Sequence, residues 1–338
     1  MQSLKAVIGM TATLALTTPV LAQEVNVYSS RHYDSDNALY EEFTAKTGVS
    51  VNRIEADADE LIARLTAEGA NSPADVFITV DVGRMARAEE ADVLQPFTSE
   101  TITSRVPEHL RHPDDLWFGL SQRARIIFYA KDRVETPPQT YEELADPKWQ
   151  GKVCIRSSSN VYNQSLLASI IEADGAEAAK EWAAGVVANM ARPPQGGDTD
   201  QLRGIVSGEC DIAVANNYYF LRGFDGEVDG LTPGIEGIGW VWPNQDGRGA
   251  HVNLAVAAMT AAAPHPEEAT ALLEFLTGEF AQTQFARDNH EYPAVKDMAA
   301  DEGTARLGTF KPDTTTNTSA FSRNAAEAQA IFNQVGWN

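Results

Sequence analysis

The sequence predicts an α/β protein of two lobes joined by a two-strand hinge, and three observations support this fold class. Short apolar strand-like segments alternate with helix-like segments, a pattern typical of mixed sheets flanked by helices. The chain has 338 residues, and about 316 would remain after loss of a 22-residue leader, a length that suits two domains. Two extended segments, 121–130 and about 237–258, are strand-like and could both cross between the lobes.

Residues 1–22 are expected to be an export signal peptide and not part of the fold. Lys5 supplies a positive charge, and the apolar run 6–16 is too short to span a bilayer. Small residues at 20–22 then offer a cleavage site. No later stretch of about 18 residues is uninterruptedly apolar. The sequence therefore predicts a protein that acts outside the cytoplasm.

Three strand–helix pairs are expected in the first hundred residues. Val25 and Val27 alternate with polar residues, as in a half-buried strand, and Leu39, Tyr40 and Phe43 recur on one helical face. The expected strands are 24–28, 49–54 and 74–80, and the expected helices are 34–46, 59–68 and 81–90.

A second series of strands and helices follows, and one long helix is expected near the end of the chain. Apolar residues recur at helical spacing from 267 to 286, directly after two prolines. The expected strands are 153–156 and 210–215, and the expected helices are 163–172, 176–190, 198–207 and 267–286. The first lobe is expected to comprise 23–122 plus about 250–292, and the second lobe 123–249 plus about 293–338.

The chain is strongly acidic, with a formal net charge of −22 at pH 7. Such a surface argues against binding to nucleic acid and to anionic lipid surfaces. It is compatible with a cationic ligand, although an acidic charge can equally serve solubility alone. We therefore expect no nucleic-acid partner and no direct insertion into a membrane.

The sequence contains two cysteines, Cys154 and Cys210. Export would place them in an oxidising compartment, where an even number favours one disulfide. Each lies at the start of an expected strand, and neighbouring strands of one sheet would bring the sulfurs within reach. A bond across their 56-residue separation would stabilise the fold by about 4 kcal/mol on the chain-entropy model. A metal site is the weaker alternative, because the pair lacks a CxxC spacing.

Four segments carry distinctive polar and aromatic residues, namely 28–33 (YSSRHY), 157–165 (SSSNVYNQS), 208–219 (GECDIAVANNYY) and 248–253 (RGAHVN). Together they resemble the periplasmic ferric-iron-binding proteins of ABC importers, and the similarity covers essentially the whole mature chain. The resemblance implies the two-lobed, transferrin-like fold of periplasmic binding proteins. It also implies a monomer in the periplasm that serves an inner-membrane ABC permease and is not an enzyme.

The same resemblance implies the ligands of a bound ferric ion. Tyr33 matches the tyrosine ligand of the first lobe, and Tyr162 matches the ligand of the middle motif. Tyr218 and Tyr219 match a pair of adjacent tyrosine ligands. All four tyrosine positions are filled, as in the members of the family that need no exogenous anion.

Three further residues are candidates around these tyrosines. His32 matches a histidine that binds iron in some members of the family and swings away in others. Arg31 and Arg123 are candidates for positions just behind the ligands.

The chemistry of tyrosine supports this ion independently. Ferric iron is a hard, highly charged cation that prefers anionic oxygen ligands over thiolates. Free tyrosine has a pKa near ~10, so a bound metal must displace each phenol proton. Consecutive residues on a strand point to opposite faces, whereas on a helical turn Tyr218 and Tyr219 can converge. We therefore expect a helical turn at this pair, near the carboxyl end of a strand, where open α/β folds bind ligands.

Three other functions remain open from the residues alone. Clustered tyrosines can enclose an organic cation such as a polyamine through cation–π contacts. An enzyme is disfavoured, because GxSxG, Walker A, HExxH and GxGxxG patterns are absent from the sequence. A sensor that uses the same cleft without transport is a third alternative.

Overall fold

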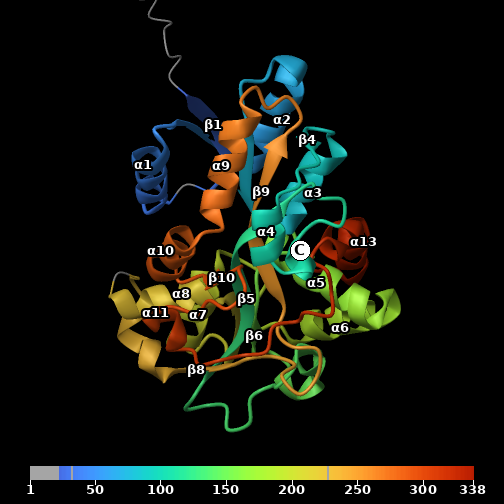
Figure 1. The fold of residues 1–338 in the computed structure, drawn as a ribbon. Coiled ribbons are helices and arrows are strands. Elements are labelled where there is room, and N and C mark those ends of the chain that lie inside the picture. The colour runs from blue at the N-terminus through green and yellow to red at the C-terminus, as the bar shows by residue number, and fades with distance from the viewer. Residues whose placement is uncertain (1–22, 32, 227) are drawn as a thin grey trace, which may run out of the picture.

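Two lobes lie one above the other, and the long strand β5 (Phe118–Ala130) runs from one into the other (Figure 1). The structure is a computed structural model that describes residues 23–31, 33–226 and 228–338. The expected signal peptide, 1–22, lies outside the described residues. Within the described part of the chain, no helix has both the length and the apolar character needed to cross a membrane.

The sheet of the first lobe is mixed. β1 pairs in parallel with β2 and β3, whereas β3 pairs antiparallel with β9, and β9 pairs antiparallel with β5. The strands of this lobe are β1 (Glu24–Ser29), β2 (Ser50–Glu55), β3 (Val76–Val80), β4 (Leu94–Gln95), β9 (Val252–Thr260) and β10 (Tyr292–Pro293). All nine residues of β9 are buried, which explains its almost continuous apolar sequence.

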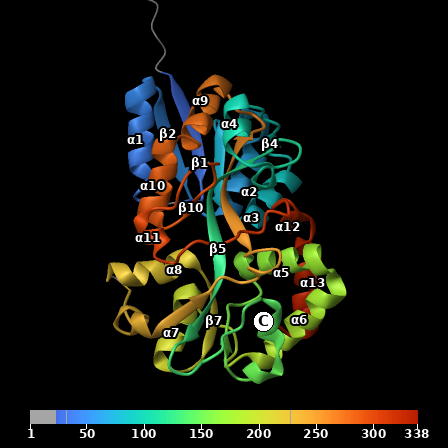
Figure 2. The ribbon, with the colours of Figure 1, turned by 60° about the horizontal axis from the view of Figure 1, so that its bottom comes forward.

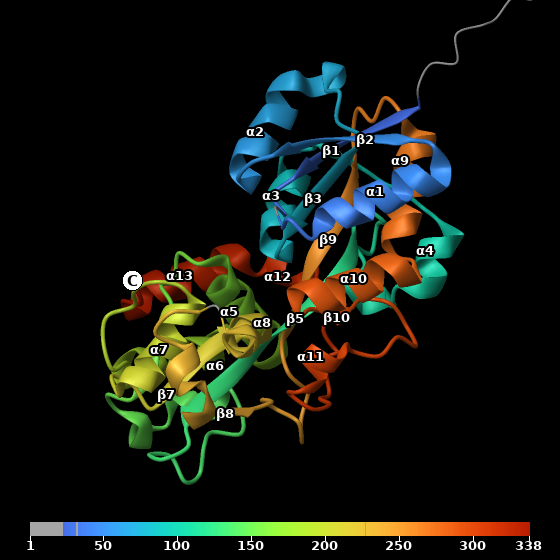
Figure 3. The same cartoon turned by 90° about the vertical axis from the view of Figure 1, so that its left-hand side faces the viewer.

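Helices cover both faces of this sheet. The helices are α1 (Asp36–Thr47), α2 (Ala58–Glu68), α3 (Val82–Glu90), α4 (Glu100–Arg105), α9 (Pro266–Leu276) and α10 (Glu279–Asn289). Figure 3 shows α2 and α3 on one side of the strands and α1 and α9 on the other. This arrangement follows from strand order, because right-handed crossovers from β1 to β2 and back to β3 place their helices on opposite faces.

The single helix expected at 267–286 is wrong, since the structure has two helices, α9 and α10, separated at Thr277 and Gly278. The Gly278 N–H donates to the Phe275 carbonyl at 2.9 Å, and the backbone of Gly278 is extended. Arg105 also donates to the Glu274 carbonyl at 3.0 Å, so a residue from another helix takes up a carbonyl at the end of α9. Apolar spacing continues across the break and therefore does not reveal it.

The second lobe contains the other part of β5, which pairs antiparallel with β7 and β8. The remaining strands are β6 (Val153–Cys154), β7 (Ile212–Asn216) and β8 (Ile238–Val241). The helices are α5 (Val161–Asp174), α6 (Ala176–Asn189), α7 (Asp198–Ser207), α8 (Asn217–Arg222), α11 (Glu302–Ala305), α12 (Ala320–Arg323) and α13 (Ala325–Val335). In Figure 2, β5 runs from the upper lobe down to the level of β7.

The predicted disulfide between Cys154 and Cys210 is confirmed. β6 and β7 are parallel neighbours, and the two cysteine Cα atoms lie 5.9 Å apart. Both cysteines are buried, and Gly204 on α7 leaves room for the sulfurs, because a Cβ there would lie 2.6 Å from Cys210 Sγ. The disulfide therefore joins the last residue of β6 to a residue two positions before β7.

Each lobe has its own hydrophobic packing. One core contains buried residues between Val25 and Leu120 and between Leu254 and Ala294. Two smaller cores contain buried residues of the second lobe, including Phe332 and Trp337 from the end of the chain. β5 and β9 are paired with each other between these cores, as the two-strand hinge requires. The residue boundaries of the lobes, at 122/123 and near 250 and 293, stay a prediction.

Candidate functional site

A cavity of about 270 Å³ lies between the two lobes and brings the four tyrosines together. The first lobe contributes Tyr33, which follows β1, and the second contributes Tyr162, Tyr218 and Tyr219. The remaining lining residues are Ser30, Arg31, Asp57, Ala58, Val80, Arg84 and Arg222. Residues separated by almost 190 positions in the sequence therefore face one space.

Tyr162 is placed by the first turn of α5. Asn160 caps this helix, and its side-chain oxygen accepts the Tyr162 N–H at 3.1 Å. The cap satisfies a backbone donor that the helix itself cannot pair, so it defines where α5 begins. The cap thereby fixes Tyr162 in the first turn of α5, and its side chain lines the cavity.

Tyr218 and Tyr219 lie in the short helix α8, directly after the end of β7. The helical turn expected at this pair is confirmed. Their rings lie 4.3 Å apart at 33°, and the Tyr162 and Tyr218 hydroxyl oxygens are 3.2 Å apart. Three phenol groups of the second lobe thus converge, as one ion would require.

Burial favours the neutral form of two of these phenols. Burial raises the pKa of Tyr218 well above its usual value, and the nearby Tyr162, Tyr219 and Tyr33 raise it further. Burial, with Tyr162 and Asp198, raises the pKa of Tyr219 to about 12. A cation that binds these oxygens must therefore displace protons.

Arginine side chains surround the tyrosines. The Arg31 guanidinium lies 4.7 Å from the centre of the Tyr33 ring, and Arg123 lies 5.9 Å from that of Tyr218. Arg222 lies within 5.9 Å of the ring centres of Tyr33, Tyr218 and Tyr219. These positive charges favour ionised phenols over neutral ones.

A buried carboxylate, Glu291, holds two of these arginines in place. Its Oε2 accepts Arg31 Nη1 at 2.8 Å and the hydroxyl of Ser121 at 2.6 Å, and its Oε1 accepts Arg123 Nη2. Asp36 pairs with Arg31 from the other side at 2.8 Å. Burial alone would raise the pKa of Glu291, but Arg123 and Arg31 lower it to about 2. The sequence-predicted Arg31 and Arg123 therefore belong to one ionic network, in which Arg31 also lines the cavity and Arg123 does not.

Sequence reasoning missed several charged residues of this site, Arg84 among them. Arg222 follows Tyr218 and Tyr219 by four and three positions on one helix, and that spacing could have identified it. Glu291 and Asp57 carry no comparable signal, because their positions depend on how distant segments pack. His32, the fifth candidate ligand, lies outside the described residues.

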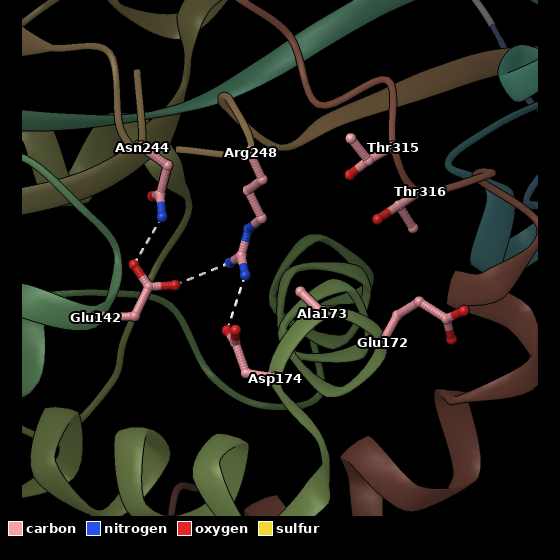
Figure 4. Close-up of a pocket in the computed structure, with 8 residues that line it drawn as sticks. All are labelled: Glu142, Glu172, Ala173, Asp174, Asn244, Arg248, Thr315 and Thr316. Atoms are coloured by element: carbon pink, nitrogen blue, oxygen red, sulfur yellow. Dashed lines mark hydrogen bonds and ion pairs between the residues drawn. The ribbon is translucent and has the colours of Figure 1, made fainter. Parts of the chain in front are cut away.

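A larger cavity, of about 470 Å³, opens elsewhere, on the second lobe (Figure 4). It shares no lining residue with the tyrosine cavity. In Figure 4, Arg248 lies between Glu142 and Asp174 and pairs with them at 3.0 Å and 2.8 Å. Among the described residues this cavity contains no tyrosine, and its arginine is already engaged by two carboxylates, so we assign the candidate site to the tyrosine cavity.

Comparison with known protein families identifies the family to which this chain belongs. Residues 38–312 match the family described as bacterial extracellular solute-binding protein, which is most of the chain. This chain belongs to that family. Two curated relatives from Synechocystis, named iron uptake protein A1 and A2, support the assignment. They are 49% and 43% identical to it, over 95% and 98% of this chain and 89% and 96% of their own lengths.

Solved structures share the two-lobed fold. A Trichodesmium protein (IdiA, FutA) in complex with iron and citrate superposes with a TM-score of 0.90 at 47% identity, over 93% of this chain and all of that one. The ferric binding protein of Campylobacter jejuni superposes with a TM-score of 0.85 at 38% identity, again over 93% of this chain and all of the other. The relatives are named as binding and uptake proteins, and the two-lobed fold predicted from the sequence is confirmed.

Proposed function

We propose that this solute-binding protein captures ferric iron in the cavity between its lobes and delivers it to an ABC importer. Tyr33, Tyr162, Tyr218 and Tyr219 are the proposed ligands, all as tyrosinates. The observation that carries the proposal is the convergence of these four side chains on one cavity, with two hydroxyl oxygens only 3.2 Å apart. Two neutral phenols can share a hydrogen bond at that distance. A shared trivalent cation additionally accounts for four tyrosines that face one cavity.

The charges around the cavity suit this cargo. Four tyrosinates would leave a trivalent ion with an excess of about one negative charge. Arg31, Arg123 and Arg222, all close to tyrosine rings, would offset that excess. Because binding displaces phenol protons, iron affinity should fall as the pH falls.

The same arginines argue against an organic cation such as a polyamine. Arg31, Arg84 and Arg222 line the cavity itself. A polyamine, which leaves the phenols protonated, would meet these like charges with no tyrosinates to offset them. A polyamine site would instead have several carboxylates in its lining. In this cavity Asp57 is the one acidic lining residue within the described part of the chain.

We also propose that the four tyrosines suffice without an added anion. The Trichodesmium relative was solved with iron and citrate, so an anion can accompany the metal in a related protein. In this chain the four protein oxygens and the arginines behind them supply both the ligands and the balancing charge. The delivery partner we propose is an inner-membrane permease, and the protein acts as a periplasmic monomer.

The test is the visible spectrum of the purified protein loaded with ferric salt, in buffer with and without citrate. We expect a red-orange tyrosinate-to-iron band in both buffers and release of protons on loading. Tyr218→Phe and Tyr219→Phe should lose most of the band, because each removes a ligand. A wild-type protein that stays colourless would exclude the proposal, and colour only with citrate would exclude the anion-free site.

A further inference from the structure

A buried hydrogen bond joins the two lobes beside the tyrosine cavity. The hydroxyl of Ser165, on α5 of the second lobe, donates to Asp81 Oδ1 of the first lobe at 2.7 Å. Asp81 is fully buried and Ser165 is 2% exposed. Water therefore does not compete for this bond, and it links one lobe directly to the helix that carries Tyr162.

The Asp81 end of this bond is firmly anchored. Asp81 caps α3, and its Oδ1 also accepts the Gly83 N–H at 2.8 Å. The Asp81 N–H donates to the Leu254 carbonyl at 2.8 Å, which ties the residue to the hinge strand β9. Its backbone has φ of 75°, an unfavourable conformation for a non-glycine residue that surrounding contacts must maintain.

The Ser165 end is rigidly connected to the cavity. Ser165 follows Tyr162 by three residues on α5, so the two side chains lie about one helical turn apart on neighbouring positions of the same face. The contact around it is close, because a Cβ on Gly83 would lie 3.1 Å from Val161 Cγ2 and 3.5 Å from Ser165 Oγ. Any change in the spacing between α3 and α5 therefore moves the start of α5.

We propose that Asp81 and Ser165 are positioning residues for iron binding, and that their bond sets the distance from Tyr162 to the first lobe and its ligand Tyr33. This inference rests on the proposed function, because it assigns the bond a role at that metal site. Neither residue lines the cavity, so each acts through Tyr162 and not by contact with the metal.

The first experiment compares Ser165→Ala with Ser169→Ala in the full chain loaded with ferric iron. Ser169 is a matched control, because it lies on the same helix, is 3% exposed and donates within the helix to the Leu166 carbonyl at 2.7 Å. We expect Ser165→Ala to release iron to a competing chelator about tenfold faster than wild type and to shift the tyrosinate band. Ser169→Ala should match the wild type in its rate of iron release and in its tyrosinate band. Thermal unfolding shows whether both variants remain folded.

Two further variants separate positioning from a loss of stability. Asp81→Asn keeps an oxygen that can accept both bonds and should retain near wild-type release. Gly83→Ala would place a methyl group 3.1 Å from Val161 Cγ2 and 3.2 Å from Asp81 Oδ1, so it should widen the α3–α5 contact and accelerate release while both hydrogen-bonding side chains are kept. Its melting temperature, measured beside that of Ser169→Ala, shows how much of the effect is a loss of stability.

A double-mutant cycle tests whether Ser165 acts through Tyr162. In a Tyr162→Phe background the added effect of Ser165→Ala on iron release should largely vanish. Full additivity, or equal release from Ser165→Ala and Ser169→Ala, would overturn the positioning role. A wild-type protein without the iron band would instead overturn the proposed function itself, so the two failures are distinguishable.

Discussion

At the scale of single residues, the charges behind the tyrosines are the most constrained part of the molecule. Glu291 is 1% exposed and touches Arg31 and Arg123, which themselves are 3% and 2% exposed. Buried charges of this kind are tolerated only when they are paired and hydrogen-bonded. The network therefore links the stability of the fold to the electrostatics of the proposed metal site.

Glu291→Gln should lower the free energy of unfolding by about 3–5 kcal/mol, because two buried guanidinium groups lose their shared carboxylate. Urea unfolding followed by circular dichroism measures this change. Glu181, an exposed residue on α6, offers a control, and Glu181→Gln should change stability by less than about 0.5 kcal/mol. Equal effects of the two substitutions would show that the network does not stabilise the fold.

His251 should make the protein less stable in acid. Burial, followed by Arg125 and Arg248, lowers the pKa of His251 to about 3, so the folded protein keeps this ring neutral. The unfolded chain binds a proton near pH 6.5, and stability is therefore complete above that pH and lost as the pH falls toward 3. The slope approaches about 1.4 kcal/mol per pH unit.

The measurement is urea unfolding of wild type and His251→Asn between pH 7 and pH 4. Carboxylates contribute equally to both proteins, so the difference between the two curves isolates the histidine. We expect the stability of wild type to fall more steeply over this range. Parallel curves would mean that folding leaves the pKa of His251 unchanged.

At the scale of elements, the cavity is built from the ends of strands and the beginnings of helices. Tyr33 follows β1, Tyr162 begins α5, and Tyr218 and Tyr219 follow β7. At such positions the sheet holds the backbone rigidly, and the identity of the side chain can vary without disturbing the sheet. The disulfide between β6 and β7 strengthens the scaffold beneath two of these positions.

Replacing both cysteines, as in Cys154→Ala with Cys210→Ala, should lower the free energy of unfolding by about 4 kcal/mol. The loss arises because the unfolded chain is no longer constrained across 56 residues. Neither cysteine lines the tyrosine cavity, so the iron band should be unchanged below the unfolding temperature. Denaturant unfolding and the visible spectrum of the same samples check both statements, and a lost band in a folded variant would contradict the second.

At the scale of the whole molecule, the distribution of ligands between the lobes is unequal. Three proposed ligands belong to the second lobe and one, Tyr33, belongs to the first. The lobes are connected by β5 and β9, and such paired strands permit hinge motion. We infer that iron docks on the second lobe first and that closure then brings Tyr33 to the metal.

Tyr33→Phe should therefore still bind iron, but more weakly and with incomplete closure. Iron loading followed by small-angle scattering should show compaction in wild type and less in this variant, while a reduced tyrosinate band remains. Tyr218→Phe serves as the comparison and should lose most of the band. A Tyr33→Phe protein that binds no iron at all would contradict the proposed order.

The sequence by itself predicted the class of fold and the pairing of the cysteines, and its resemblance to ferric-iron-binding proteins pointed to the four tyrosines that line the cavity. These predictions depend on local information, namely alternating periodicity, an even number of cysteines, and short motifs that resemble those of a known family. The helical turn at Tyr218 and Tyr219 was also predictable, because adjacent residues cannot converge from a strand.

The tertiary structure alone decided the rest. Arg31 and Glu291 are 260 residues apart, and Asp81 and Ser165 are 84 apart, so no local pattern relates them. The separation of α9 from α10 depends on Thr277, Gly278 and a contact from Arg105, not on apolar spacing. A buried charge requires a partner close to it in space. The packing of whole elements decides which residue that partner is, and the two residues can be far apart in the sequence.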